Sequence, residues 1–234
     1  GAVYKAIDFT GSYVENLGVS GRMVVCNMAV EMGAKTAYMQ PNQAVLDYVS
    51  KRAVRPFEVQ YTDPDFKYEE SYVFDVSELE PQLACPYSVD NVAPLSEVIK
   101  DRTITLNQGY IGSCTGGREE DIAQAAKILE GKHIPKYARL VVVPASAEVM
   151  QSCMEKGYIQ SLMAAGATIT TPGCGACLGA HEGILAPGEN CITTTNRNFP
   201  GRMGSTEADI YLASPATVAA SILNGCITDP RNYL

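Results

Sequence analysis

The pattern of apolar and polar positions divides the chain into a first part with few clear elements and a second part with regular alternation. In the first part, residues 22–32 have apolar positions at helical spacing and end at Gly33, which can adopt the positive φ of a helix C-terminus. Residues 37–39 predict a short strand, and residues 41–51 predict a second helix. Residues 55–86 are polar and proline-rich, and only residues 69–76 have the pattern of a strand.

In the second part, strands alternate with helices. The pattern predicts strands over residues 108–113, 139–143, 167–171, 191–195 and 209–213, and helices over residues 118–130, 147–156 and 216–223. Such alternation favours parallel pairing of the strands, with helices on both faces of the sheet. We therefore predict an α/β fold with a mostly parallel sheet and two subdomains, residues 1–104 and 105–234, with an irregular linker before Thr105.

Composition narrows the classes of protein to consider. The net charge of −8 and the scattered lysines and arginines argue against a nucleic-acid-binding surface, and no apolar run predicts a membrane-spanning helix. The 8 cysteines in 234 residues are too sparse for a disulfide scaffold, and no signal-peptide pattern precedes them. We therefore expect a cytoplasmic protein. Because the chain starts at Gly1, without an initiator methionine, we also expect a fragment of a longer protein.

Three cysteines lie in glycine-rich turns that each follow a predicted strand. Cys114 is part of Gly-Ser-Cys-Thr-Gly-Gly, and Cys174 and Cys177 are part of Pro-Gly-Cys-Gly-Ala-Cys-Leu-Gly. Loops that leave the carboxyl ends of parallel strands meet at one edge of a sheet. No fourth cysteine or histidine stands at ligand spacing, and glycines let the backbone approach inorganic sulfide. The pattern therefore favours an iron–sulfur cluster with one iron open to substrate.

Other interpretations of these cysteines remain open. A redox dithiol would begin a helix directly after Cys177, whereas Gly179 interrupts the chain there. A structural zinc site needs a fourth ligand, and His181 and Cys191 lie outside the usual spacings. Free cysteine also packs as a small apolar residue in tight turns. That last interpretation is our expectation for the other cysteines, which are Cys26, Cys85, Cys153, Cys191 and Cys226.

Two further pairs of residues are candidates for chemistry. Arg197 and Arg202 bracket a glycine-bearing loop, and guanidinium groups bind carboxylates through two parallel hydrogen bonds, so a dicarboxylate or tricarboxylate is the expected substrate. The alternative is a pair of solvated surface arginines. Asn27 and Glu31 lie four residues apart on a predicted helix and are either an ordinary polar face or an amide and a carboxylate that face a metal-bound hydroxyl.

Taken in order, these motifs resemble the aconitase superfamily. The resemblance rests on Gly-Ser-Cys-Thr at residues 112–115, Pro-Gly-Cys-x-x-Cys-Leu-Gly at 172–179, Asn-Arg-Asn-Phe-x-Gly-Arg at 196–202 and the segment 21–34. It is strongest to the 3-isopropylmalate dehydratase large-subunit family, with homoaconitase and 2,3-dimethylmalate dehydratase large subunits as near relatives. The implied fold is an aconitase-like three-layer αβα arrangement.

The resemblance implies a role for each motif. Cys114, Cys174 and Cys177 would ligate a [4Fe-4S] cluster. Asn27 and Glu31 would be catalytic, and the substrate-binding residues would be Arg197, Arg202 and Asn196. The implied activity is that of a hydro-lyase that isomerises a hydroxy di- or tricarboxylate by dehydration and rehydration, such as 2-isopropylmalate to 3-isopropylmalate in leucine biosynthesis.

The chain also departs from the family pattern. It has no Asp-Ser-His-Thr motif, which the family carries on a preceding domain, and the family's catalytic serine lies on a swivelling domain that would here be a separate small subunit. We therefore expect the chain to be inactive alone, and an isolated fragment could lack the cluster. Gly116 replaces the family's asparagine, which predicts a looser turn. The non-enzymatic alternatives are a zinc-stabilised module and a cluster-free interaction domain.

Overall fold

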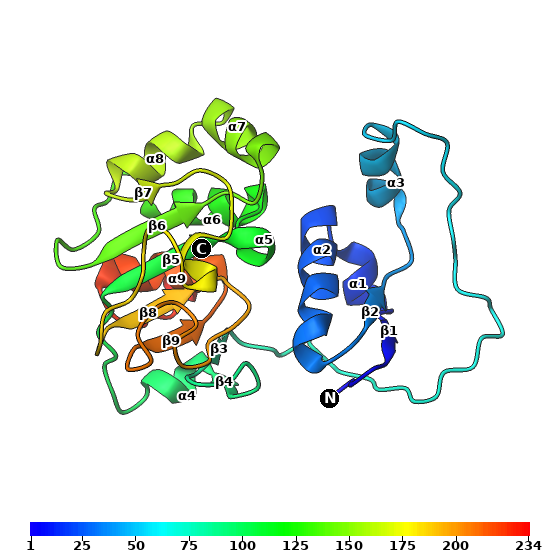
Figure 1. Ribbon diagram of the computed structural model, residues 1–234, viewed down its shortest axis with the longest axis horizontal. Coiled ribbons are helices and arrows are strands. Elements are labelled where there is room, and N and C mark those ends of the chain that lie inside the picture. The colour runs from blue at the N-terminus through cyan, green and yellow to red at the C-terminus, as the bar shows by residue number, and fades with distance from the viewer. The chain divides into compact units, whose positions relative to one another are not determined.

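The computed structural model describes residues 1–234, and the chain forms two compact units (Figure 1). The first unit is Gly1–Glu78 and the second is Leu79–Leu234. This division comes before Thr105, where the sequence predicts a boundary, because two strands that precede Thr105 join the sheet of the second unit. No helix in either unit has the length and apolar character that crossing a membrane requires.

The first unit contains a small parallel sheet and short helices. Its elements are β1 (Ala6–Asp8), α1 (Ser12–Asn16), α2 (Val19–Met28), η1 (Ala29–Met32), β2 (Thr36–Tyr38) and α3 (Gln43–Ser50). The α-helix predicted through residue 32 ends earlier, at Met28, and continues as the 3-10 turn η1. Gly33 ends this turn with a φ of 82°, as predicted. Asn42 caps α3 because its side chain accepts a hydrogen bond from the Val45 amide at 3.1 Å.

A buried arginine holds the helices of the first unit to its loops. Arg22 on α2 is only 6% exposed. Its guanidinium donates hydrogen bonds to the carbonyl oxygens of Leu17 at 3.0 Å, Gln40 at 2.8 Å and Val14 at 2.8 Å. A buried charge is tolerated when its donors are satisfied in this way. Arg22 therefore compensates for a small core in which only Ala29, Ala34 and Met39 are buried apolar residues.

The end of the first unit, residues 51–78, forms neither helix nor strand. The strand predicted at residues 69–76 is therefore wrong. An extended segment becomes a strand only when a neighbouring strand pairs with its backbone, and none lies beside this segment. Its apolar side chains face solvent instead: Val73 is 96% exposed and Phe74 is 81% exposed.

The second unit is built on a seven-stranded sheet in the order β4-β3-β9-β8-β5-β6-β7 (Figure 1). The strands are β3 (Gln82–Ala84), β4 (Val92–Pro94), β5 (Gln108–Gly112), β6 (Arg139–Val143), β7 (Thr168–Ile169), β8 (Asn190–Thr193) and β9 (Asp209–Leu212). The five strands from β9 to β7 pair in parallel. The hairpin of β3 and β4 adds an antiparallel edge. The prediction of a mostly parallel sheet is confirmed.

Helices cover one face of this sheet. The helices of the second unit are α4 (Leu95–Ile99), α5 (Ser113–Gly116), α6 (Glu119–Leu129), α7 (Ala147–Glu155), α8 (Tyr158–Ala164) and α9 (Pro215–Asn224). Alternate residues of β6 point to opposite faces: Leu140 and Val142 pack in the core that contains α6, α8 and α9, whereas Val141 and Val143 pack in a second core. That second core is formed by loops and a short 3-10 turn, where the sequence predicts helices.

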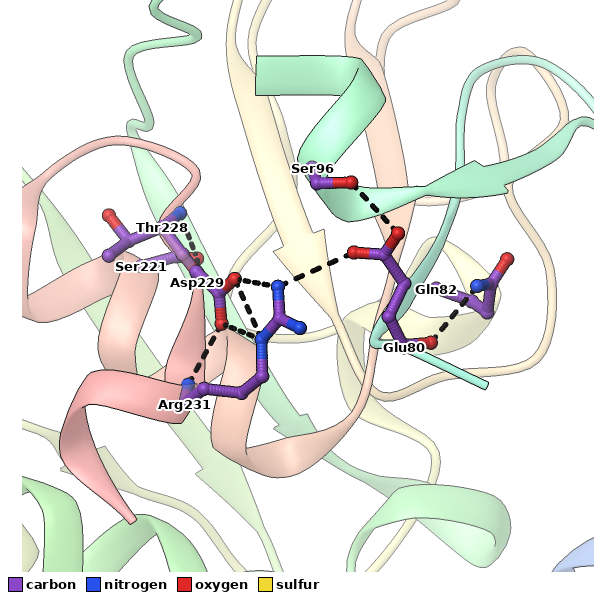
Figure 2. Close-up of polar contacts among 7 residues, drawn as sticks. All are labelled: Glu80, Gln82, Ser96, Ser221, Thr228, Asp229 and Arg231. Carbon is purple, nitrogen blue, oxygen red and sulfur yellow. Dashed lines mark hydrogen bonds and ion pairs between the residues drawn. The ribbon is translucent and has the colours of Figure 1, made fainter. Parts of the chain in front are cut away.

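Polar contacts join the end of the second unit to its beginning (Figure 2). Arg231, in the C-terminal 3-10 turn η3 (Pro230–Tyr233), donates hydrogen bonds to the Asp229 carboxylate and, at 3.4 Å, to Glu80 just before β3. Ser96 on α4 also donates to Glu80, at 2.9 Å. These contacts link the segment before β3 and the start of α4 to the C-terminal turn.

Candidate active site at the carboxyl edge of the parallel sheet

Three loops leave the carboxyl ends of strands in the parallel part of the sheet. The loop with Cys114 follows β5, the turn with Cys174 and Cys177 follows β7, and the loop with Asn196 and Arg202 follows β8. From β5 the strands β6 and β7 follow on one side, and the next strands along the chain, β8 and β9, lie on the other side, so the strand order reverses at β5. Such a switch point in an α/β sheet opens a crevice in which ligands bind.

The backbone at Cys114 turns sharply from strand to helix. Ser113 is fully buried and has a φ of 70°, a left-handed conformation that costs a non-glycine residue on the order of 1–3 kcal/mol. Directly after it, Cys114 lies in the short helix α5 and is exposed to solvent. Strained residues of this kind cluster at functional sites, so the conformation supports a functional role for this turn.

Gly116 does not loosen the Cys114 turn, contrary to the expectation from its replacement of asparagine. Gly116 is buried, and a Cβ atom there would lie 2.2 Å from both Cβ and Oγ1 of Thr194. The Thr194 hydroxyl donates a hydrogen bond to the Gly116 carbonyl at 2.9 Å. The absence of a side chain therefore lets the turn pack directly on the residue that follows β8.

The second cysteine turn is attached to β5 by a buried tyrosine. The hydroxyl of Tyr110 donates a hydrogen bond to the carbonyl of Cys174 at 2.9 Å. Burial, with the nearby Cys177 sulfur, raises the pKa of Tyr110 above its ordinary value, so the hydroxyl remains a neutral donor. After Cys174 the chain makes only the 3-10 turn η2 (Gly175–Leu178). No longer helix follows, which gives no support to the thioredoxin-like interpretation.

Cys177 is the point where the second cysteine turn meets the loop after β8. Its buried thiol donates to the Asn196 side-chain oxygen at 3.8 Å, and the Arg202 guanidinium donates to the Cys177 sulfur at 3.8 Å. The Nε atom of Arg202 is buried and has no hydrogen-bond partner. The fold therefore brings together three of the predicted site residues. Arg197 lies half-buried in the same loop.

The sequence did not single out Asn198 and Thr194, although both hold these loops. Asn198 is 1% exposed, and its amide donates to the carbonyl oxygens of Cys85 at 2.8 Å and Ser88 at 3.3 Å. It thus ties the arginine loop to the turn between β3 and β4. The Asn-Arg-Asn-Phe motif contains Asn198, but spacing alone does not show which of its residues face the protein.

Asn27 and Glu31 both belong to the first unit. Asn27 lies on α2 and Glu31 on η1, and both are half-buried. Their predicted spacing on one face of an α-helix is altered because the helix tightens between them. Their part in catalysis stays a prediction.

The cysteines of the second unit provide thiol donors of the kind that an iron–sulfur cluster takes. No group of three or more His, Cys, Asp or Glu side chains is close enough to hold a metal ion. Of the fourth ligands considered for zinc, Cys191 is fully buried on β8. An iron–sulfur cluster places its cysteines on separate irons, farther apart than the ligands of one ion. The exposed thiols of Cys114 and Cys174 and the unpartnered donor of Arg202 suit an anionic cluster of this kind.

Comparisons of the sequence with known proteins identify its relatives. The model of the aconitase family (aconitate hydratase) matches residues 1–225. The chain is 52% identical over its whole length to 3-isopropylmalate dehydratase large subunit 1 of Methanopyrus kandleri, of which it covers 55%. It is 49% identical over 99% of its length to a probable methanogen homoaconitase large subunit of Methanosarcina mazei, of which it covers 58%. The chain thus spans just over half the length of these relatives.

Proposed function

Because the chain belongs to the aconitase family, we propose that it is the cluster-binding part of the large subunit of an iron–sulfur hydro-lyase. In this proposal Cys114, Cys174 and Cys177 hold a [4Fe-4S] cluster. The observation that carries it is the meeting of two loops at Cys177, whose sulfur accepts from the Arg202 guanidinium while the Nε of that guanidinium has no partner. When bound, the cluster supplies a Lewis-acidic iron for the substrate hydroxyl.

The residues of the chain have distinct tasks in this reaction. Arg197 and Arg202 bind the substrate carboxylates, because a guanidinium matches a carboxylate with two parallel donors. The Nε atom of Arg202 is free for such a bond. Asn196 holds its loop against Cys177. Asn27 and Glu31 provide an amide and a carboxylate that accept hydrogen bonds from the leaving hydroxyl and orient it.

We expect a partner subunit to supply the catalytic base. The relatives are named as large subunits, which supports a small subunit as partner. In this proposal the small subunit carries the swivelling domain with the catalytic serine. We propose 2-isopropylmalate as substrate, which would place the enzyme in leucine biosynthesis in the cytoplasm. Homocitrate and 2,3-dimethylmalate are the alternatives, and the similar identities of 52% and 49% to two kinds of relative support neither strongly.

The cluster is tested by anaerobic reconstitution of the chain with iron and sulfide. We expect about four iron and four sulfide per chain and a broad brown absorption. Cys174→Ser should lose most of both, whereas Cys226→Ser should retain them, because Cys226 lies next to the end of α9 and outside the three loops. Binding of one zinc without sulfide, or equal loading of the two variants, would contradict the proposal.

Activity is tested with the reconstituted chain, alone and together with a small subunit and the rest of a large subunit. We expect no measurable hydration or dehydration by the chain alone, because in this proposal the serine base lies on the small subunit. The complete assembly should isomerise 2-isopropylmalate in preference to the two alternative acids. Substantial turnover by the chain alone would show that it carries its own base.

A further inference from the structure

The hydroxyl of Thr194 bonds to the Cys114 turn on both sides of the cysteine. It accepts a hydrogen bond from the Gly112 amide at 3.0 Å and donates one to the Gly116 carbonyl at 2.9 Å. Gly112 and Gly116 each lie two residues from Cys114. Thr194 and both glycines are buried, so water cannot replace either bond. A single side chain thus fixes the beginning and the end of the turn.

Thr194 also connects the Cys114 turn to the other two loops. It directly follows β8 and stands two residues before Asn196. Its backbone amide donates to the carbonyl of Tyr110 at 3.0 Å, and the Tyr110 hydroxyl in turn donates to the Cys174 carbonyl. The Cys114 turn, the arginine loop and the second cysteine turn are therefore linked through Thr194 and its neighbour on β5.

From these contacts we infer that Thr194 is a positioning residue for Cys114. The hydroxyl holds the strained turn so that the exposed thiol faces the cluster, and it does so without contacting the cluster itself. The inference rests on the proposed function, because it takes Cys114 as a cluster ligand. Loss of the hydroxyl should therefore speed the loss of iron from the cluster, while the stability of the fold changes little.

The test compares Thr194→Val with Thr194→Ser and Thr193→Val. Valine keeps the shape of threonine and removes both hydrogen bonds, whereas serine keeps the hydroxyl. Thr193 is the matched control because it is fully buried and its hydroxyl is equally engaged, but with Thr195 rather than with the Cys114 turn. All four proteins are studied as the full 234-residue chain.

Two measurements separate positioning from general stability. The first is the rate at which a chelator removes iron from the reconstituted protein, which should rise about fivefold or more in Thr194→Val, the equivalent of one net hydrogen bond. The second is amide hydrogen exchange at Gly112, which should accelerate by a similar factor in the same variant without iron. Thr194→Ser and Thr193→Val should match the wild type in both, whatever small changes occur in their melting temperatures.

A second pair of variants tests the same contact from the other side. Gly116→Ala places a Cβ atom 2.2 Å from Thr194 and should reproduce the faster iron loss. Gly18→Ala adds the same atom just before α2 in the first unit, where nothing lies within 4 Å, and should leave iron loss unchanged.

Thr194→Val that loses iron at the wild-type rate would overturn the inference, whether or not Gly112 exchanges faster. Failure of the proposed function looks different, because the wild-type chain would then bind no cluster. In that case the inference is tested by amide hydrogen exchange at Gly112 alone. Faster exchange only in Thr194→Val supports the positioning of Cys114 by Thr194. Unchanged exchange in this variant overturns the inference.

Discussion

At the scale of single residues, the environment of each cysteine decides what it can do. All eight cysteines are free. Cys153 and Cys191 are fully buried, and burial raises the pKa of Cys153 to about 11 and that of Cys191 to about 12. Cys114 and Cys174 are exposed at the ends of parallel strands. The buried pair has a packing role, whereas the exposed pair is available for chemistry.

This difference predicts the order in which an alkylating reagent modifies the native apoprotein. At pH 8, only about one Cys153 thiol in a thousand is ionised if its pKa is about 11, and the thiolate is the reactive form. Cys114 and Cys174 should therefore be labelled first, and Cys153 and Cys191 only after unfolding. Mass spectrometry of peptides from timed reactions measures the order. Labelling of Cys191 as fast as Cys114 in the folded chain would contradict it.

At the scale of elements, the start of α6 contains a half-buried carboxylate. Asp121 accepts a hydrogen bond from the Arg118 amide at 2.9 Å, which fixes the first turn of the helix. Burial raises the pKa of Asp121 to about 6, with a smaller contribution from the nearby Glu120. At neutral pH the Asp121 carboxylate is therefore charged, and its charge lowers the free energy of unfolding. The residue lies shortly after the Cys114 turn in the chain.

The raised pKa predicts a pH-dependent stability. Between about pH 4 and pH 6 the folded chain binds the Asp121 proton more tightly than the unfolded chain, so this group makes the fold less stable as pH rises through that range. Asp121→Asn keeps an acceptor for the Arg118 amide and removes the charge. Its free energy of unfolding at pH 7 should exceed that of the wild type by on the order of 1–3 kcal/mol.

Urea unfolding of both proteins at several pH values measures this difference. The advantage of Asp121→Asn should shrink as pH falls from 7 to 4 and approach zero below about pH 3, where Asp121 is neutral in both states. A difference that stays constant with pH would show that the pKa of Asp121 is not raised in the folded chain. A less stable variant at pH 7 would show that the helix N-terminus stabilises the charge more than burial opposes it.

At the scale of the whole molecule, the two units differ in how much apolar surface they bury. The second unit has two cores on the two faces of its sheet. The first unit buries little beyond Arg22 and three small or flexible apolar residues, and residues 51–78 expose theirs. Segments with few buried contacts open at low free energy, so stability is concentrated in the second unit.

Limited digestion with trypsin should therefore cut the first unit before the second. Arg55 and Lys67 lie in the segment without helix or strand, whereas Lys127 and Arg139 lie within α6 and β6. We expect cleavage at the first two sites at least tenfold faster than at the last two, which leaves a stable fragment close to Leu79–Leu234. Mass spectrometry identifies the fragments. Equal cleavage at Lys127 would show that the second unit is not independently compact.

Much of the second unit could be predicted from the sequence because its elements are defined locally. The apolar run of β6 lies where the pattern predicts it, and α9 ends at Gly225 with a φ of 69°, as its Asn-Gly sequence indicates. The sequence pattern did not predict helix α8. Gly157 indicates the end of the preceding helix, α7, but in the structure α8 begins directly after this glycine.

The sequence by itself determined that strands and helices alternate after Thr105 and that cysteines and arginines stand where strands end. Only the tertiary structure decided the strand order, the addition of β3 and β4 at one edge, and the contacts of Cys177 with Arg202 and of Thr194 with Gly116. The physical reason is the distance in sequence between the interacting residues. A helix cap or an apolar strand depends on residues nearby in the chain. The hydrogen bond from the Thr194 hydroxyl to Gly116 spans 78 residues, so it depends on which strands lie side by side.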